Sequence, residues 1–313
     1  MENEYQFLTD VQVEDRPDPD WLIANILPAS SLGLVVGQSE SFKTFLVLDW
    51  VLSIGTGSDW LGHKCEEGLV AYIAAEGTPG LGRRIKAWKS FNDHRVTKAR
   101  FLLEVVPFMH EQAQNDLLRT LEDLPEAPKM VVVDTMHRSM AGGDENSAKD
   151  VGTFVDVCDR IRKITGATVL TVHHMGKSKV KKERGSSALR GAMDTVFLVE
   201  RSGKSSSMTV TCDKQKDAEG FDQIGLKKEV IKVGSGTSCI LIDREASAAL
   251  TEKEKEVLDV LKGTATRAEW MEKLGLAPRT FDRVAKSLVA KGYVGKTEIG
   301  SYVITEKGQN AAG

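Results

Sequence analysis

A segment near the amino terminus has the residue types and spacing of a phosphate-binding loop. Residues 37–44 follow the apolar run 32–36, and their last two residues open a stretch with the pattern of a helix, 43–54. In such a loop, backbone N–H groups surround phosphate oxygens, a lysine contacts the β- and γ-phosphates, and a hydroxyl binds Mg²⁺. We therefore expect ATP and Mg²⁺ to bind at Gly37, Gln38, Ser39, Glu40, Ser41, Phe42, Lys43 and Thr44. The alternative is a chance strand–turn–helix with a surface lysine.

Two residues of this segment depart from the usual pattern. Phe42 stands where phosphate loops normally carry a second glycine. Glu40 brings a carboxylate, which would repel an anionic ligand unless its side chain points outward.

Two acidic residues follow apolar runs further along the chain. Asp134 ends the run 130–133, where a carboxylate would hold Mg²⁺ and its water ligands. Glu76 closely follows the run 69–74, and at the end of a parallel strand it would face the γ-phosphate and act as the base for a water molecule. For Glu76 the alternative is a solvated acid at a strand end. Together with the loop, the two acids predict nucleotide hydrolysis.

The elements that must position these residues alternate between short apolar runs and longer amphipathic stretches. Buried strands are expected at 32–36, 69–74, 101–106, 130–133, 167–172 and 195–199. Helices are expected at 43–54, 80–91, 112–124 and 147–165. This alternation predicts an α/β fold with a mostly parallel sheet covered on both faces. Antiparallel strands are then expected at 208–213, 225–232 and 239–242.

The pattern changes again near residue 251. Thr251 and Glu254 form a capping box that opens a helix to about residue 262. Helices at 267–274 and 278–292 and a hairpin at 293–305 complete the outline of a winged helix. We therefore expect a tail (1–20), an ATPase domain (21–243) and a small C-terminal winged-helix domain (244–313).

Composition excludes several classes of protein. The 313 residues are 41% hydrophobic and 28% charged, which is typical of a globular chain. Lys and Arg number 42 against 45 Asp and Glu, so any nucleic-acid surface must be local. No run is long and apolar enough to span a membrane, and the acidic start lacks the pattern of a secretory signal. Four widely spaced cysteines favour reduced thiols, and we expect an intracellular protein.

The ordered motifs resemble those of a known family. Residues 20–232 are similar to the RecA-like ATPases of the RepA group of hexameric replicative helicases, which are common on plasmids and phages. The resemblance rests on the segments 21–23, 37–45, 59–62, 70–77, 82–88, 131–136, 171–177 and 184–194. Phe42 is tolerated in this branch, whereas Glu40 replaces the family's usual glycine. The RepA proteins are not expected to carry a winged helix, so this chain is a relative of them.

The resemblance implies a RecA-like P-loop NTPase core that assembles as a ring, usually of six subunits, with ATP at the interfaces. Lys43 and Thr44 would hold the triphosphate and Mg²⁺, Asp134 would support the metal, and Glu76 would polarise the attacking water. His174, at the end of the strand beside the Asp134 strand, would sense the γ-phosphate. The alternative for His174 is a local hydrogen bond at the strand end.

Two cationic groups also have implied roles. The segment after His174 corresponds to a DNA-binding loop that faces the ring channel, unless it is a solvated loop, and its cations are Lys177, Lys179, Lys181, Lys182 and Arg184. Lys214 and Lys216 correspond to cations that enter the neighbouring subunit's active site and stabilise the transferring phosphoryl group. Arg190 is a competing candidate for that role, and an exposed hairpin tip is the alternative for the lysine pair.

The third C-terminal helix has one cationic face. Arg279, Arg283 and Lys286 recur on that face, as in a recognition helix that enters the major groove of DNA. A protein-interaction module is the alternative, because residues 251–313 are close to neutral.

These observations predict a ring-forming, ATP-hydrolysing DNA helicase that acts in replication and grips single-stranded DNA. We expect a homo-hexamer in the cytoplasm of a prokaryotic or phage-infected cell, with no membrane and with a primase as a candidate partner. Two alternatives are an ATP-switched winged-helix regulator that binds DNA, and a RecA-like recombination or repair ATPase without unwinding activity.

Overall fold

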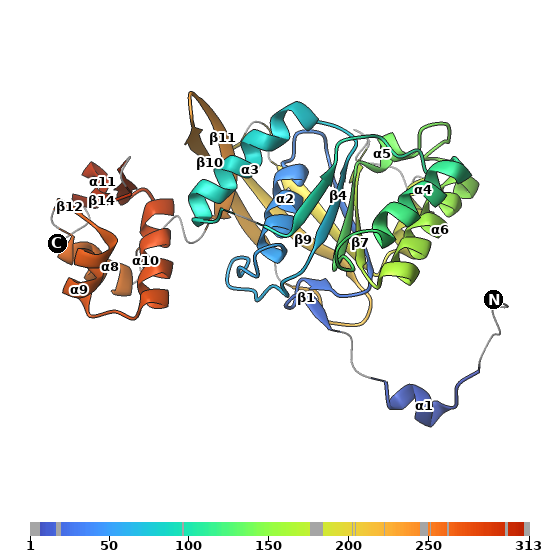
Figure 1. Ribbon diagram of the computed structural model, residues 1–313, viewed down its shortest axis with the longest axis horizontal. Helices are drawn as coiled ribbons and strands as arrows, with labels where there is room; N and C mark the ends of the chain where they lie inside the picture. The colour runs from blue at the N-terminus through green and yellow to red at the C-terminus, as the bar shows by residue number, and fades with distance from the viewer. Residues whose placement is uncertain are drawn as a thin grey trace.

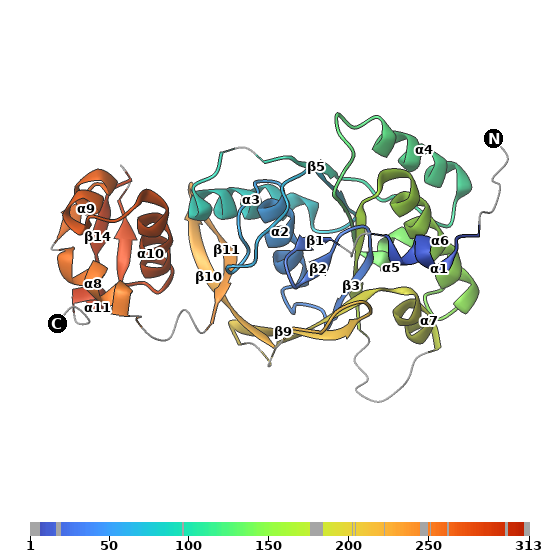
Figure 2. The ribbon, with the colours of Figure 1, turned by 90° about the horizontal axis from the view of Figure 1, so that it is seen from below.

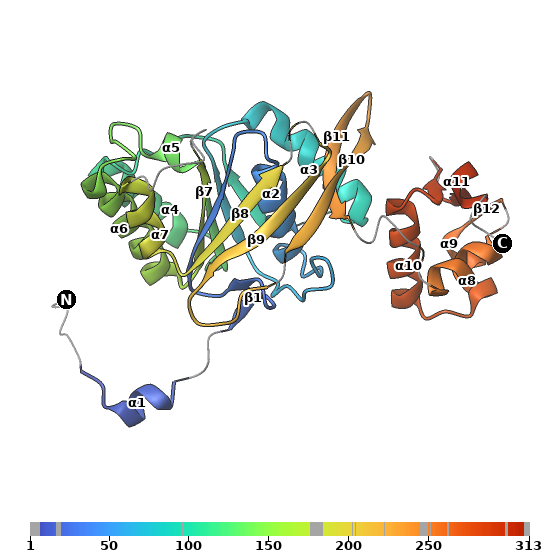
Figure 3. The same ribbon diagram turned by 180° about the vertical axis from the view of Figure 1, so that it is seen from behind.

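The computed structural model describes residues 7–16, 20–95, 97–175, 184–201, 203, 205–221, 223–244, 250, 252–261, 263–297 and 300–309. Its centre is a nine-stranded sheet in the order β11-β10-β9-β8-β3-β7-β6-β4-β5 (Figures 1 and 3). Six strands are parallel: β3 (Leu32–Gly37), β4 (Val70–Ala74), β5 (Ala99–Leu102), β6 (Met130–Asp134), β7 (Thr168–His174) and β8 (Thr195–Arg201). Three antiparallel strands extend the sheet: β9 (Ser207–Gln215), β10 (Ile224–Val233) and β11 (Gly236–Asp243).

Helices cover both faces of the sheet (Figure 2). One face packs against α2 (Lys43–Ile54) and α3 (Thr78–Asn92). The other packs against α4 (Glu111–Glu122), α5 (Met136–Ser139), α6 (Ala148–Thr165) and α7 (Arg184–Ala192). The predicted α/β fold with a mostly parallel sheet is therefore confirmed.

The continuous apolar runs exist because the central strands are buried on both faces. In β6, Met130 and Val132 join the core under α2 and α3, whereas Val131 and Val133 join the core under α4 and α6. Successive side chains of a strand point to opposite faces, so a two-faced core requires apolar residues at every position. Asp134 is the first residue of this run that is not apolar.

Asp49, inside α2, is the one acid that interrupts the apolar stretch 45–57. Its carboxylate accepts hydrogen bonds from the indole N–H of Trp60 at 2.9 Å and of Trp88 at 2.5 Å. Burial raises the pKa of Asp49 to about 6, although both indole hydrogen bonds favour the ionised form. Two tryptophans thus make this acid compatible with the core.

The C-terminal elements have a core of their own. Their order is α8 (Glu252–Val260), β12 (Thr264–Ala265), α9 (Arg267–Leu274), α10 (Pro278–Ala290), β13 (Val294–Lys296), β14 (Tyr302–Ile304) and α11 (Glu306–Gln309). The three strands form a separate antiparallel sheet in the order β12-β14-β13. Trp270, Phe281 and Tyr302 pack edge to face or tilted at the centre of this core.

Several expected boundaries are wrong. The strand expected at 101–106 is β5, which begins at Ala99 and ends at Leu102 because its partner β4 ends at Ala74. Leu103 and Val105 beyond it are 55% and 37% exposed. The expected tail contains a short helix, α1 (Asp10–Glu14), whose Thr9–Gln12 capping box is a local sequence signal that we overlooked.

Other small elements have weaker signals. The hairpin of β1 (Trp21–Ile23) and β2 (Leu27–Pro28), together with α5, α7, β12 and α11, was not expected from the sequence. Within the described ranges, no helix combines the length and the apolar character that crossing a membrane requires.

Candidate nucleotide-binding site

The phosphate-loop segment lies between the end of β3 and the start of α2. Two of its residues have a left-handed backbone, Glu40 with φ of 62° and Phe42 with φ of 69°. The side chain of Glu40 is exposed, so its carboxylate lies on the outside of the loop. The first-turn N–H groups of α2 lack partners within the helix and are available to an anion. Residues 37–44 thus have the backbone form of an anion-binding loop.

Gly37, the first residue of this loop, is required by close packing. A Cβ atom at Gly37 would lie 2.3 Å from the carbonyl oxygen of Val199 in β8 and 2.8 Å from the Ser41 hydroxyl. Any side chain at Gly37 would therefore displace the backbone of β8 from the loop. Ser41 is 2% exposed, and its hydroxyl has no partner among the residues that the structure describes.

Lys43 is buried beneath the loop. Its ammonium donates to the carbonyl oxygens of Gly37 at 2.8 Å and Gln38 at 2.7 Å. Burial lowers the pKa of Lys43 to about 8, and the nearby carboxylates of Asp134 and Glu76 act in the opposite direction. A buried cation near two acids, at the uncapped start of α2, fits a phosphate chain with a bound metal ion.

Asp134 lies at the end of β6 and is 3% exposed. It accepts a hydrogen bond of 2.5 Å from the Tyr72 hydroxyl, and the Thr44 hydroxyl also hydrogen-bonds to it. Burial raises the pKa of Asp134, and both hydrogen bonds lower it. Tyr72 comes from β4, the strand beside β6. The expected pair of magnesium-binding groups, Thr44 and Asp134, is therefore in direct contact and fits a metal ion.

Glu76 follows β4 and lies beside the same strand ends. Its carboxylate accepts a hydrogen bond from the hydroxyl of Thr135, the residue after Asp134. The Nε2 atom of His174 lies 3.8 Å from Oε1 of Glu76. Burial and the nearby Lys43 ammonium lower the pKa of His174, which favours the neutral ring at pH 7. The Nδ1 atom of His174 has no partner within the described part of the chain.

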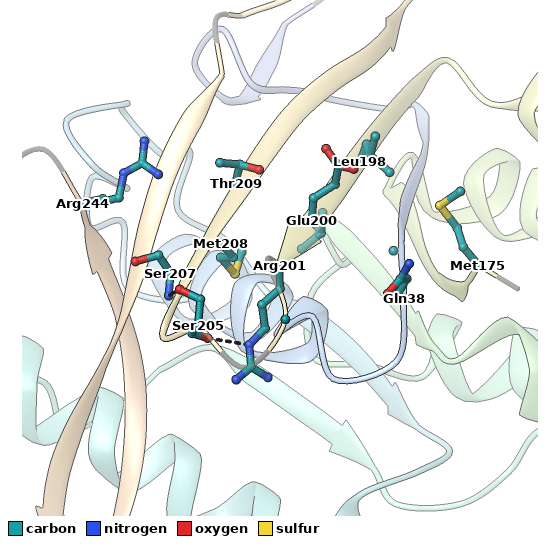
Figure 4. A pocket seen from close by; sticks show the side chains of 13 residues that line it. Gln38, Met175, Leu198, Glu200, Arg201, Ser205, Ser207, Met208, Thr209 and Arg244 are labelled. Atoms are coloured by element: carbon teal, nitrogen blue, oxygen red, sulfur yellow. Dashed lines mark hydrogen bonds between the residues drawn. The ribbon is translucent and has the colours of Figure 1, made fainter. Parts of the chain in front are cut away.

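Sequence reasoning missed Tyr72 and Thr135, and it also missed Arg201, which lies at the end of β8. Arg201 donates to the carbonyl oxygen of Glu40 at 3.0 Å, and its guanidinium lies 4.3 Å from the ring centroid of Phe42. Figure 4 shows the bond of 2.6 Å that Arg201 also donates to the Ser205 carbonyl oxygen. A cation at a strand end next to the loop is the only sequence signal for this contact.

A cavity of about 890 Å³ opens beside the loop (Figure 4). Gly37 and Gln38 form one wall, and the end of β8 with the start of β9 forms another. Arg201, the last residue of β8, and Arg244, the residue after β11, both line it (Figure 4). The phosphate loop therefore borders a cavity large enough for a small ligand.

The expected trans-acting cations lie elsewhere. Lys214 pairs with Val196 at the start of β8, whereas Gly37 pairs with Val199 further along the same strand. The Lys214 ammonium donates to the carbonyl oxygens of Arg190, Gly191 and Met193 at the end of α7. Lys216 lies 3.4 Å from Asp194, and Arg190 forms an ion pair with Asp213. These cations cluster at the amino-terminal ends of the parallel strands, away from their own phosphate loop.

The expected DNA contacts are only partly within the described residues. Lys177, Lys179, Lys181 and Lys182 lie outside them, and for Arg184 and Arg279 the backbone alone is described, within α7 and α10. Arg283 is exposed on α10. Lys286 is exposed on the same helix, and its ammonium lies 5.9 Å from the ring centroid of Phe91 in α3.

A comparison with protein-family models identifies the family of this chain. A family model described as an AAA domain matches residues 2–180. The crystal structure of the RadB recombinase matches with a TM-score of 0.47 and 14% identity, over 64% of this chain and 87% of that one. No curated protein matches the sequence. The segment 2–180 is more than half of the 313 residues and holds the phosphate loop, Glu76, Asp134 and His174, so the chain belongs to the AAA domain family of P-loop ATPases.

Proposed function

We propose that this protein hydrolyses ATP at the interfaces of a hexameric ring that grips single-stranded DNA, as a RepA-type replicative helicase. The observation that carries the proposal is the convergence of Lys43, Asp134 and Glu76, from three separate strand ends, at one phosphate loop. A binding loop alone would need only the first of these groups. A second acid beside the metal-binding acid is what hydrolysis requires.

Each residue has a distinct part in the reaction. Bound MgATP supplies a phosphoryl group whose charge is partly neutralised by the metal. Lys43 and the backbone N–H groups of the loop hold the phosphate oxygens, while Thr44 and Asp134 hold the metal and its water ligands. Glu76 accepts the proton of the attacking water, and the hydrogen bond from Thr135 keeps its carboxylate at the strand end.

The position of Lys214 and Lys216 supports action between subunits. They lie at the opposite end of the sheet from Lys43 of the same chain, so they reach a nucleotide only in a neighbouring copy. A head-to-tail contact between copies places one end of a subunit against the other end of the next, and such contacts form a ring where the rotation between copies closes. In this assembly the cations stabilise charge on the transferring phosphoryl group.

We extend the proposal to the C-terminal elements as a winged-helix domain. Three helices precede a hairpin, and β12 pairs with β14 beside β13, which matches the order expected for that fold. α10 would enter DNA with Arg279, Arg283 and Lys286 on its cationic face. The proximity of Lys286 to Phe91 means that α10 must move from α3 before this face can bind a duplex.

One experiment tests the core of the proposal. ATP hydrolysis is measured with and without single-stranded DNA, together with the mass of the assembly and the unwinding of a forked duplex. The expected result is a hexamer with DNA-stimulated hydrolysis and strand displacement, with hydrolysis and displacement abolished by Lys43→Ala. Hydrolysis that survives Lys43→Ala would contradict the site assignment.

The same measurements separate the competing functions. DNA-stimulated hydrolysis without strand displacement would favour a recombination or repair ATPase. Sequence-specific binding of a duplex by the full chain, controlled by ATP and lost in a variant with Arg283 and Lys286 both changed to Ala, would favour a regulator.

A further inference from the structure

The phosphate loop contains two bends that glycine usually makes. Glu40 and Phe42 both have positive φ angles, in the left-handed region where a side chain is strained. Phe42 is also the N-cap of α2, and its side chain caps none of the helix N–H groups. Some other contact must therefore hold the loop in this form.

Arg201 contacts both strained residues. One guanidinium nitrogen donates to the Glu40 carbonyl oxygen at 3.0 Å, and the guanidinium lies over the Phe42 ring at 4.3 Å from its centroid. Arg201 is held in turn by its Nε donation of 2.6 Å to Ser205. An arginine over an aromatic face is attracted by the ring quadrupole, and its planar fork can donate hydrogen bonds at the same time.

The aromatic ring is suited to this contact. The Phe42 ring meets the edge of Phe45 at 6.1 Å between centroids, and the Lys228 ammonium lies 5.6 Å from the Phe42 centroid. A glycine at this position would tolerate the left-handed bend without help, but it would offer Arg201 no surface. Phenylalanine lacks the backbone freedom of glycine, but its ring gives Arg201 a surface to contact.

The same strand supports both ends of the loop. The Val199 carbonyl oxygen packs against Gly37 at the start, and Arg201, further along β8, contacts Glu40 and Phe42 near the end. β8 pairs directly with β3, so its end is fixed relative to the loop by the sheet.

We propose that Arg201 is a positioning residue for nucleotide binding, which holds the phosphate loop in its binding form through Phe42 and the Glu40 carbonyl. The inference rests on the proposed ATPase function. The proposal implies that the contribution of Arg201 to nucleotide affinity depends on having Phe rather than Gly at position 42. Its loss should weaken nucleotide affinity while leaving Glu76 and Asp134, which Arg201 does not contact within the described structure, able to support turnover at saturation.

The test is a double-mutant cycle on the full chain. Binding of Mg·ADP is measured by calorimetry for the wild type, Arg201→Ala, Phe42→Gly and the double variant, and kcat and KM are measured for ATP. We expect Arg201→Ala to weaken binding about tenfold and to raise KM, with kcat changed less than about threefold. In the Phe42→Gly background the same change should weaken binding less, by about threefold or less, because the contact with the ring is absent and only the hydrogen bond of Arg201 to the Glu40 carbonyl remains.

Arg119→Ala is the matched control, because Arg119 is an exposed arginine of α4 that lines neither the phosphate loop nor the cavity. It should bind Mg·ADP as the wild type does. Thermal unfolding without nucleotide shows whether each variant folds. If Arg201→Ala does not fold, Arg201→Lys takes its place in the cycle, since lysine keeps the charge and loses the planar fork.

Two results would overturn the inference. One is wild-type affinity in the Arg201 variant, and the other is an equal loss in both backgrounds, which would mean that Arg201 does not act through Phe42. The proposed function fails in a different way, namely if Lys43→Ala binds Mg·ADP as tightly as the wild type does.

Discussion

The two ends of the parallel sheet hold their charged groups in different ways. At the carboxyl ends, Lys43 and Asp134 are each 3% exposed and converge on one loop. At the amino-terminal ends, the side chains of Lys216 and Arg190 are 62% and 50% exposed. Lys214 there donates to carbonyl oxygens of its own chain.

The difference in exposure indicates which charged side chains already have a fixed arrangement before a nucleotide binds. Buried charges keep a fixed geometry because their partners are close and water is excluded, and that is how a site acts without reorganising. Exposed cations at a helix end have favourable local contacts that a competing anion can replace. The carboxyl end is therefore a preformed half-site, and in the proposed ring the cations of the amino end would act only against another copy.

The largest effect should come from the base at the preformed end. Glu76→Gln removes the proton acceptor and retains a similar shape, so turnover should fall at least about a hundredfold while Mg·ADP affinity changes less than about threefold. Steady-state hydrolysis and calorimetry measure the two quantities. Glu122→Gln, at the end of α4 and outside the site, is the matched carboxamide control and should leave both unchanged.

Loss of binding in Glu76→Gln would give this residue a structural role instead. Its main contribution would then be the hydrogen bond that it accepts from Thr135, and the carboxyl end of the sheet would hold one functional acid rather than two.

The amino end can be tested by mixing two variants of reduced activity. Lys214→Ala should lower turnover about tenfold or more, and an equal mixture with Lys43→Ala should recover activity at roughly a quarter of the interfaces, where both wild-type residues meet. Lys163→Ala, an exposed lysine near the end of α6, should leave turnover unchanged.

A mixture no more active than its components would contradict the proposal that the amino end of one copy acts on the carboxyl end of another. Lys214 would then act within its own chain, by capping the carbonyl oxygens at the end of α7.

The convergence at the carboxyl end could be predicted from the sequence, because apolar runs that end in Asp134 and near Glu76 must deliver these acids to one edge of a parallel sheet. The contacts of Tyr72, Thr135 and Arg201 could not. They depend on which strands are neighbours and on how each side chain is rotated, and no local spacing encodes either. Arg201, for example, lies 161 positions beyond Glu40, whose carbonyl oxygen accepts its hydrogen bond.

A substitution at Tyr72, whose contact with Asp134 was not predicted from the sequence, should have an effect of intermediate size on turnover. Tyr72→Phe removes one of the hydrogen bonds that hold the Asp134 carboxylate, so turnover should fall about tenfold and the Mg²⁺ concentration for half-maximal activity should rise. Tyr302→Phe in the C-terminal core is the matched control. An unchanged magnesium dependence would show that Thr44 alone orients Asp134.

The smallest effect on activity is expected from a substitution at Asp49. This variant tests whether burial of an acidic side chain is enough to indicate a functional group. Its pKa of about 6 exceeds the unfolded value near 4, so the folded state binds the proton more tightly. Stability from this group is complete below about pH 4 and is lost as the pH rises through about 6, by on the order of 3 kcal/mol. Asp49→Asn should remove this component of the pH dependence of unfolding, measured by urea titration between about pH 4 and 7, and change turnover less than about twofold. A large loss of turnover with unchanged stability would place Asp49 in the site, and burial would then mark function at both positions of α2 rather than at Lys43 alone.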